Sequence, residues 1–171
     1  MTKTKSLILC ALFAALIGVG ARLTIPTPII PITLQTLFVF LSGLLLGKKR
    51  GASAALVYAL LGLAGLPVFS KGGGFWYVLE PSFGYIVSFI FASYAIGVIT
   101  EKKPDFIGML IACIAGTAII YAVGILYYFL VSHFYLAKGI DLSKLILLPL
   151  PGDIISALFA AFLGVKIRKY I

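Results

Sequence analysis

Six long apolar segments alternate with short polar stretches along the chain. They cover residues 6–23, 33–47, 51–66, 82–100, 106–131 and 151–166. A bilayer core of ~30 Å needs about 20 helical residues, so the second, third and sixth segments must extend into their flanks or lie in thinned or protein-shielded membrane. Pro26, Pro28 and Pro31 predict a non-helical crossover after the first segment. The pattern predicts an all-α, polytopic membrane protein with six transmembrane helices.

Composition supports a lipid environment. Hydrophobic residues make up 62% of the chain and charged residues 11%, and the mean hydropathy is +1.17. These values are typical of helical membrane proteins and far from those of soluble domains. A chain of 171 residues has room for about six spans and not for a second domain of ordinary size. We therefore expect a single integral-membrane domain over residues 1–171.

The basic residues predict the orientation of the spans. With the N-terminus in the cytoplasm, ten of the 14 basic residues fall inside and four outside. The inner ten are Lys3, Lys5, Lys48, Lys49, Arg50, Lys102, Lys103, Lys166, Arg168 and Lys169, and the outer four are Arg22, Lys71, Lys138 and Lys144. This bias places both termini in the cytoplasm. It also explains the net charge of +9 by helix orientation, so no nucleic-acid partner is expected.

Asp153 is the candidate polar residue at the external side. Two prolines and a glycine precede it in "LPLPGDII", so it should lie at or just inside the outer end of the sixth helix. One interpretation is an N-terminal helix cap, where a carboxylate accepts backbone N–H bonds. The other is a ligand site, because ionisable groups near membrane depth are costly and tend to be functional.

The predicted external loop combines glycines with aromatic residues. Gly73 and Gly74 belong to a triple glycine, and Trp76, Tyr77 and Tyr85 follow it. Glycines permit a hinge and aromatic side chains exclude water, so this stretch could be a lid over a small apolar ligand. The alternatives are a flexible connector for the glycines and an interfacial aromatic belt for Trp76 and Tyr77.

The chain lacks the residues of an enzyme or of a self-powered pump. It contains one His, His133, and two Cys, Cys10 and Cys113, both inside apolar segments. No cluster fits a metal centre or a catalytic site, so no cofactor or metal is expected. The segment "GLLLGKKR" lacks the spacing of a phosphate-binding loop, and no internal repeat suggests a stand-alone carrier. If the protein moves a solute, another component must supply the energy.

Four motifs together resemble one known family. "IPITLQTLFVFLSGLLLG", "GLAGLPVF", "EPSFGYIVSF" and "PGDII" occur in this order over nearly the whole chain. They resemble the successive motifs of the BioY family, the biotin-specific S-components of energy-coupling factor (ECF) transporters. The resemblance implies a six-helix bundle with cytoplasmic termini in a prokaryotic cell membrane, and high-affinity capture of biotin from outside. It also implies a transmembrane coupling protein and two cytoplasmic ATPases, which topple the S-component to open its pocket inward.

Biotin suggests roles for several residues. Asp153 is a suitable acceptor for the ureido N–H groups, and Gln35 is the natural amide partner unless it only packs between helices. Tyr85 and the loop residues Trp76 and Tyr77 could cover the ligand. The predicted binding set also includes Lys71, Gly73, Gly74 and Glu80.

One position departs from the family pattern. Ser156 lies one helical turn after Asp153, where members commonly carry Lys. Lys71 or Arg22 could replace that cation, or could simply extend to the membrane interface. The departure keeps related ligands open, namely desthiobiotin or lipoate.

The first helix carries a candidate docking motif. Ala11 and Ala15 lie four residues apart on one face, and small residues at this spacing allow close helix approach in lipid. By resemblance to other S-components, this face should dock on the coupling protein.

The alternative to a vitamin-binding transport subunit, from a different functional class, is an accessory membrane protein that binds no ligand.

Overall fold

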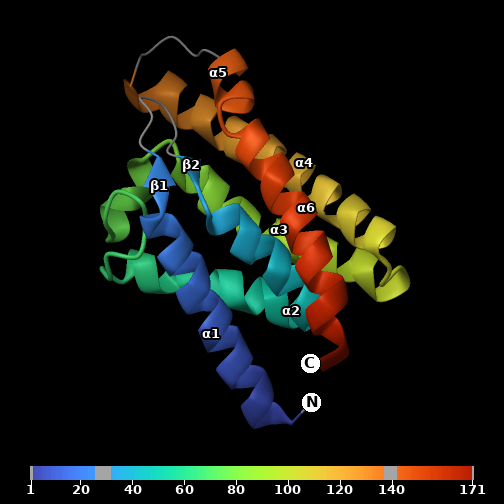
Figure 1. The fold of residues 1–171 in the computed structure, drawn as a ribbon. Helices are drawn as coiled ribbons and strands as arrows, with labels where there is room; N and C mark the ends of the chain where they lie inside the picture. The colour runs from blue at the N-terminus through green and yellow to red at the C-terminus, as the bar shows by residue number, and fades with distance from the viewer. Residues whose placement is uncertain (1, 26–31, 137–141, 171) are drawn as a thin grey trace.

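The computed structural model describes residues 2–25, 32–136 and 142–170 (Figure 1). Its long helices are α1 (Lys3–Arg22), α2 (Gln35–Leu63), α3 (Phe83–Lys102), α4 (Phe106–Val131) and α6 (Leu150–Ile167). The shorter elements are β1 (Thr24–Ile25), β2 (Ile32–Thr33), the 3-10 helices η1 (Phe75–Leu79) and η3 (Arg168–Tyr170), the π-helical turn η2 (Ser132–Leu136) and α5 (Leu142–Leu147). The prediction of a proline crossover at 26–31, and the external position of Lys138, concern residues outside the described ranges.

The helices have the character of membrane spans. Among the described residues, four helical segments are long and apolar enough to cross a bilayer: Lys3–Arg22, Phe83–Lys102, Phe106–Phe134 and Leu145–Tyr170. Large apolar side chains such as Leu7, Ile107 and Ile155 lie on the outside of the bundle, each more than 60% exposed. A helix that is apolar all round belongs in lipid or in a core. The prediction of a helical, multi-pass membrane protein is confirmed.

Helix α2 bends sharply at Gly47. This residue has φ 77° and ψ 178°, a backbone conformation that is open essentially to glycine alone. The predicted second and third spans, 33–47 and 51–66, fall on the two sides of the bend, and Lys48, Lys49 and Arg50 follow it directly. Each half is shorter than a full membrane span, so the total of six spans stays a prediction for these two halves.

Helix α3 packs between α2 and α4, α6 packs against α2 and α4, and α1 packs against α2. The two-residue strands β1 and β2 pair antiparallel beside the C-terminal end of α1. The core between the helices is apolar, and many of its side chains are at most 1% exposed. Its large members include Ile17, Phe40, Tyr58, Ile96 and Cys113.

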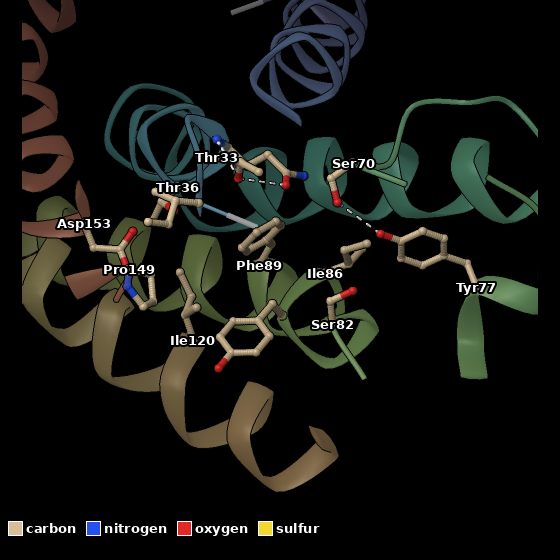
Figure 2. A pocket seen from close by; sticks show the side chains of 13 residues that line it. Thr33, Thr36, Ser70, Tyr77, Ser82, Ile86, Phe89, Ile120, Pro149 and Asp153 are labelled. Carbon is tan, nitrogen blue, oxygen red and sulfur yellow. Dashed lines mark hydrogen bonds between the residues drawn. The ribbon is translucent and has the colours of Figure 1, made fainter. Parts of the chain in front are cut away.

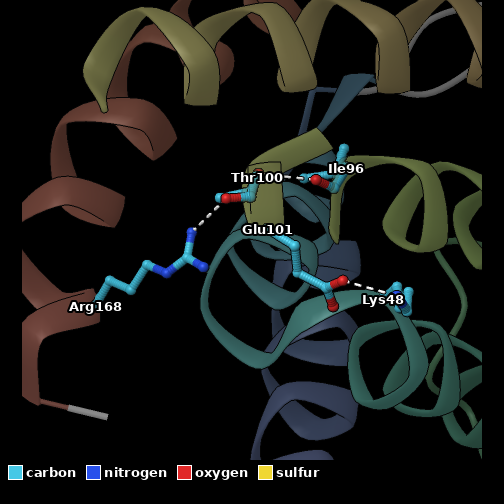
Figure 3. A network of polar contacts seen from close by, with 5 residues as sticks. All are labelled: Lys48, Ile96, Thr100, Glu101 and Arg168. Carbon is cyan, nitrogen blue, oxygen red and sulfur yellow. Dashed lines mark hydrogen bonds and ion pairs between the residues drawn. The ribbon is translucent and has the colours of Figure 1, made fainter. Parts of the chain in front are cut away.

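Both chain ends lie at the same end of the bundle, opposite the β1–β2 pair and α5 (Figure 1). Polar contacts tie three helices together at the bend of α2 (Figure 3). Lys48 Nζ lies 2.7 Å from Glu101 Oε2, and Arg168 Nη1 donates to the Thr100 carbonyl at 2.9 Å. A Cβ added to Gly97 of α3 would lie only 2.1 Å from the backbone nitrogen of Lys48. The backbone of α3 is therefore in direct contact with the backbone of α2 at the bend. The shared location of the termini agrees with the predicted topology.

Candidate ligand-binding site

A cavity of about 60 Å³ opens among the ends of five elements at the side of the bundle away from the termini. It is narrow, and its wall combines apolar side chains with hydroxyl, amide and carboxylate groups (Figure 2). Helices α2, α3, α4 and α6, strand β2 and the loop before α3 contribute to it. The lining residues are Ile32, Thr33, Gln35, Thr36, Ser70, Tyr77, Ser82, Tyr85, Ile86, Phe89, Ile120, Pro149 and Asp153.

Asp153 forms one end of the cavity. It lies in the first turn of α6 and is 8% exposed. The Tyr121 hydroxyl of α4 donates to Asp153 Oδ2 at 2.7 Å, and Thr36 of α2 lies beside the same carboxylate (Figure 2). The residue that caps α6 is Pro149, without a side-chain hydrogen bond. A cap at the N-cap position therefore does not explain Asp153, whose carboxylate is oriented by neighbouring helices.

Gln35 is held by a short chain of hydrogen bonds. Its Nε2 donates to the Tyr58 hydroxyl at 2.7 Å, and its Oε1 accepts from the Thr33 hydroxyl at 3.0 Å. The Tyr58 hydroxyl donates in turn to the Val68 carbonyl at 3.3 Å. An amide NH₂ has two donors, and among the described residues only one of them, the bond to Tyr58, has an acceptor, while these bonds fix the plane of the side chain.

The loop before α3 folds down onto the bundle. Phe69 is fully buried and its ring centroid lies 4.5 Å from that of Tyr77. Tyr77 is 6% exposed, and its hydroxyl lies 3.2 Å from Ser70 Oγ. Both residues line the cavity. The loop therefore covers the cavity through Ser70 and Tyr77, with Phe69 as the residue that anchors it.

Two buried hydroxyl groups at the cavity have no hydrogen-bond partner within the described structure. They are Ser82 Oγ and Tyr85 Oη. Buried polar groups are almost always paired. Ser82 and Tyr85 both line the cavity, so these two side chains are candidates for hydrogen bonds to a bound polar group.

The structure gathers four of the nine predicted binding residues at the cavity: Asp153, Gln35, Tyr85 and Tyr77. The other five lie elsewhere. Trp76 is 81% exposed, Lys71 Nζ pairs with Glu80 Oε2 at 2.9 Å, and Gly73 and Gly74 pack the loop against the end of α2. A ligand contact by any of these five stays a prediction.

The suggested replacements for the family lysine are engaged elsewhere. Lys71 is paired with Glu80, and Arg22 donates to the Pro67 carbonyl. Ser156 is buried but does not line this cavity. Among the described lining residues there is no Lys or Arg, so the site offers a carboxylate and neutral hydrogen-bonding groups.

Sequence reasoning missed the residues that complete the site. Thr36 adjoins Gln35 in the chain and could have been included with it. Tyr121, Ser70 and Ser82 carried no usable signal, because nothing in their spacing shows that they meet the cavity or Asp153. Tyr121 and Asp153 are 32 residues apart and meet only through the packing of α4 on α6.

Ala11 and Ala15 lie exposed on α1. They border a shallow groove between α1 and the second half of α2, together with Gly18, Val57 and Leu61. None of the residues that line this groove lines the cavity that holds Asp153. The predicted docking face is thus physically open, and its use stays a prediction.

Among the described residues, the bundle has a cavity lined by polar and apolar groups at the end away from the termini, an arrangement that suits a membrane protein that binds a small molecule. Comparison with known proteins identifies the family to which the chain belongs. The family model described as "BioY family" matches residues 1–171, and the chain belongs to this family. A protein of Lysinibacillus sphaericus named "Probable biotin transporter BioY" is 40% identical, over 97% of this chain and 88% of its own length.

Further relatives agree. The "Biotin transporter BioY" of Thermotoga maritima is 40% identical over 96% of both chains. A crystal structure described as the S-component for biotin from an ECF-type ABC transporter superposes with a TM-score of 0.85 and 30% identity, covering 100% of this chain and 96% of the other. The predicted fold, a transport subunit and not an enzyme, and the location in a prokaryotic cell membrane all agree with these proteins.

Proposed function

We propose that this chain is the biotin-binding S-component of an ECF-type transporter. The observation that carries the proposal is the buried Asp153 carboxylate, oriented by Tyr121 at one end of a cavity whose middle is apolar. Biotin has the matching chemistry, because its ureido ring presents two N–H donors and its thioether ring and chain are apolar. The chain's membership of the BioY family supports the same ligand.

Different residues of the cavity contact different parts of biotin in this proposal. Asp153 accepts from the ureido N–H groups, and the second N–H of Gln35 is available to the ureido carbonyl. Ile86, Phe89 and Ile120 line the middle of the cavity, where they contact the ring and chain and exclude water. Tyr77 and Ser70 close the cavity from the loop side. Charge-assisted hydrogen bonds in a buried site are stronger than those between neutral groups.

Transport requires partners that supply energy. We infer a transmembrane coupling protein and two cytoplasmic ATPases, in line with the ECF-type complex named for the structural relative. The exposed face of Ala11 and Ala15 is the proposed docking surface, because small side chains let a partner helix approach closely in lipid. Biotin then enters from outside and leaves inward once the bound ATPases act.

The test is calorimetric titration of biotin, desthiobiotin and lipoate into detergent-purified protein, in wild type and Asp153→Asn. Asparagine is neutral and keeps only one acceptor oxygen for the two ureido donors, so we expect at least a tenfold weaker affinity for biotin, given that a hydrogen bond to a charged group contributes about 1.5–3 kcal/mol. Asp105→Asn is the matched control, since Asp105 is exposed and precedes α4 at the other end of the bundle.

Each alternative has its own result. Tight binding of lipoate without biotin would assign the related ligand. Absence of binding of all three compounds to folded wild-type protein would leave only the accessory-protein hypothesis.

A further inference from the structure

The hydroxyl of Ser82 makes no hydrogen bond to any described residue. Ser82 is the N-cap residue of α3, but its side chain makes no capping hydrogen bond. The backbone satisfies this turn by itself, with Phe83 N–H donating to the Glu80 carbonyl at 2.9 Å and Tyr85 N–H to the Ser82 carbonyl at 3.1 Å. Ser82 is nevertheless 8% exposed, and its Oγ is unpaired. A buried hydroxyl without a partner is unfavourable unless something else binds it.

This hydroxyl lies at an electrostatically positive place. Helix α3 has 20 residues, and the N-terminus of a helix carries partial positive charge that favours anions. The Ser70–Tyr77 hydroxyl pair lies toward the same end of the cavity, away from Asp153 (Figure 2). The cavity is therefore polarised, with a carboxylate at one end and, at the other, a helix N-terminus, the unpaired Ser82 hydroxyl and the Ser70–Tyr77 pair.

We propose that the α3 N-terminus, with Ser82 Oγ as its hydrogen-bond donor, binds the carboxylate group of the ligand. A ligand carboxylate is repelled by Asp153 and attracted to the α3 end, which fixes the direction in which the molecule enters. The inference rests on the proposed function and adds to it the recognition of the acidic end. It also explains how a cavity whose described lining has no Lys or Arg accepts an anion.

The experiment compares biotin with biotinamide, which has the same rings and chain but no charge. In Ser82→Ala we expect biotin affinity to fall about tenfold or more, as for a lost hydrogen bond to a charged group, and biotinamide affinity to fall by a smaller factor, as for a lost hydrogen bond between neutral groups. Ser132→Ala is the matched control, because Ser132 Oγ is also buried and unpaired but lies outside the cavity. This control should bind both compounds as wild type does.

Ser82→Asp keeps the proposal testable if the alanine variant unfolds, because aspartate is a favourable N-cap residue. A carboxylate there should weaken biotin by at least tenfold more than biotinamide. Equal losses for the two compounds, or no loss for either, in a folded Ser82 variant would overturn the proposal while biotin binding by wild type keeps the proposed function intact. Failure of wild type to bind biotin at all would instead overturn the proposed function and this inference together.

Discussion

Tyr121→Phe tests how the Asp153 carboxylate is held. The variant removes one hydroxyl and keeps the ring, which packs edge-on against Tyr85 at a centroid distance of 6.5 Å. The lost bond is a 2.7 Å O–H···O contact to a carboxylate that is 8% exposed. Such bonds contribute about 1.5–3 kcal/mol. For a chain of this size that corresponds to a fall of about 3–12 °C in Tm at roughly 2–4 °C per kcal/mol.

The assay is thermal unfolding in detergent without ligand, followed by titration with biotin. We expect the Tm to fall while biotin binds more tightly than it does to Asp153→Asn, because Tyr121→Phe retains the carboxylate that accepts from the ureido group. Tyr94→Phe is the control, since Tyr94 is 46% exposed on α3. An unchanged Tm would refute the stabilising role of the bond. A loss of biotin affinity equal to that of Asp153→Asn would show that Tyr121 itself contacts the ligand.

Three further substitutions test other parts of the structure. Gly47→Ala should destabilise the protein by about 1–3 kcal/mol, because alanine is strained at φ 77°. Gly152→Ala is the control and should change the Tm little, because its Cβ would meet Ile32 at an ordinary contact distance of 3.5 Å. Bulky replacements at Ala11 and Ala15 should abolish uptake in cells and spare biotin binding in detergent; full uptake by such a double variant would remove the docking assignment. Trp76→Ala should leave biotin affinity within about twofold, as expected for an interfacial side chain that is 81% exposed; a larger loss would establish that the loop closes on the ligand.

The amino-acid sequence alone determined the solvent, the helices and the main polar candidates. In lipid every backbone polar group must be satisfied within the segment, so apolar runs such as 82–100 and 106–131 become helices whatever their neighbours are. The same cost of burying polar groups makes Asp153 and Gln35 conspicuous in an apolar chain. Both line the cavity. This agrees with the rule that a polar residue within a membrane segment is costly and tends to be functional.

Tertiary structure decided which groups meet. The rotation and packing of α4 against α6 bring Tyr121 to Asp153, and the entry angle of α3 leaves the Ser82 hydroxyl unpaired at the cavity. The hydrophobic pattern of the sequence does not predict these contacts. Each span is apolar on all sides, so the pattern does not distinguish the face that packs on another helix from the face that meets lipid. The exclusion of Trp76 and Lys71 from the cavity likewise follows from how the loop packs through Phe69. The residue types in the sequence therefore identified the candidate binding residues, and only the packing of the helices decided which of them line the cavity.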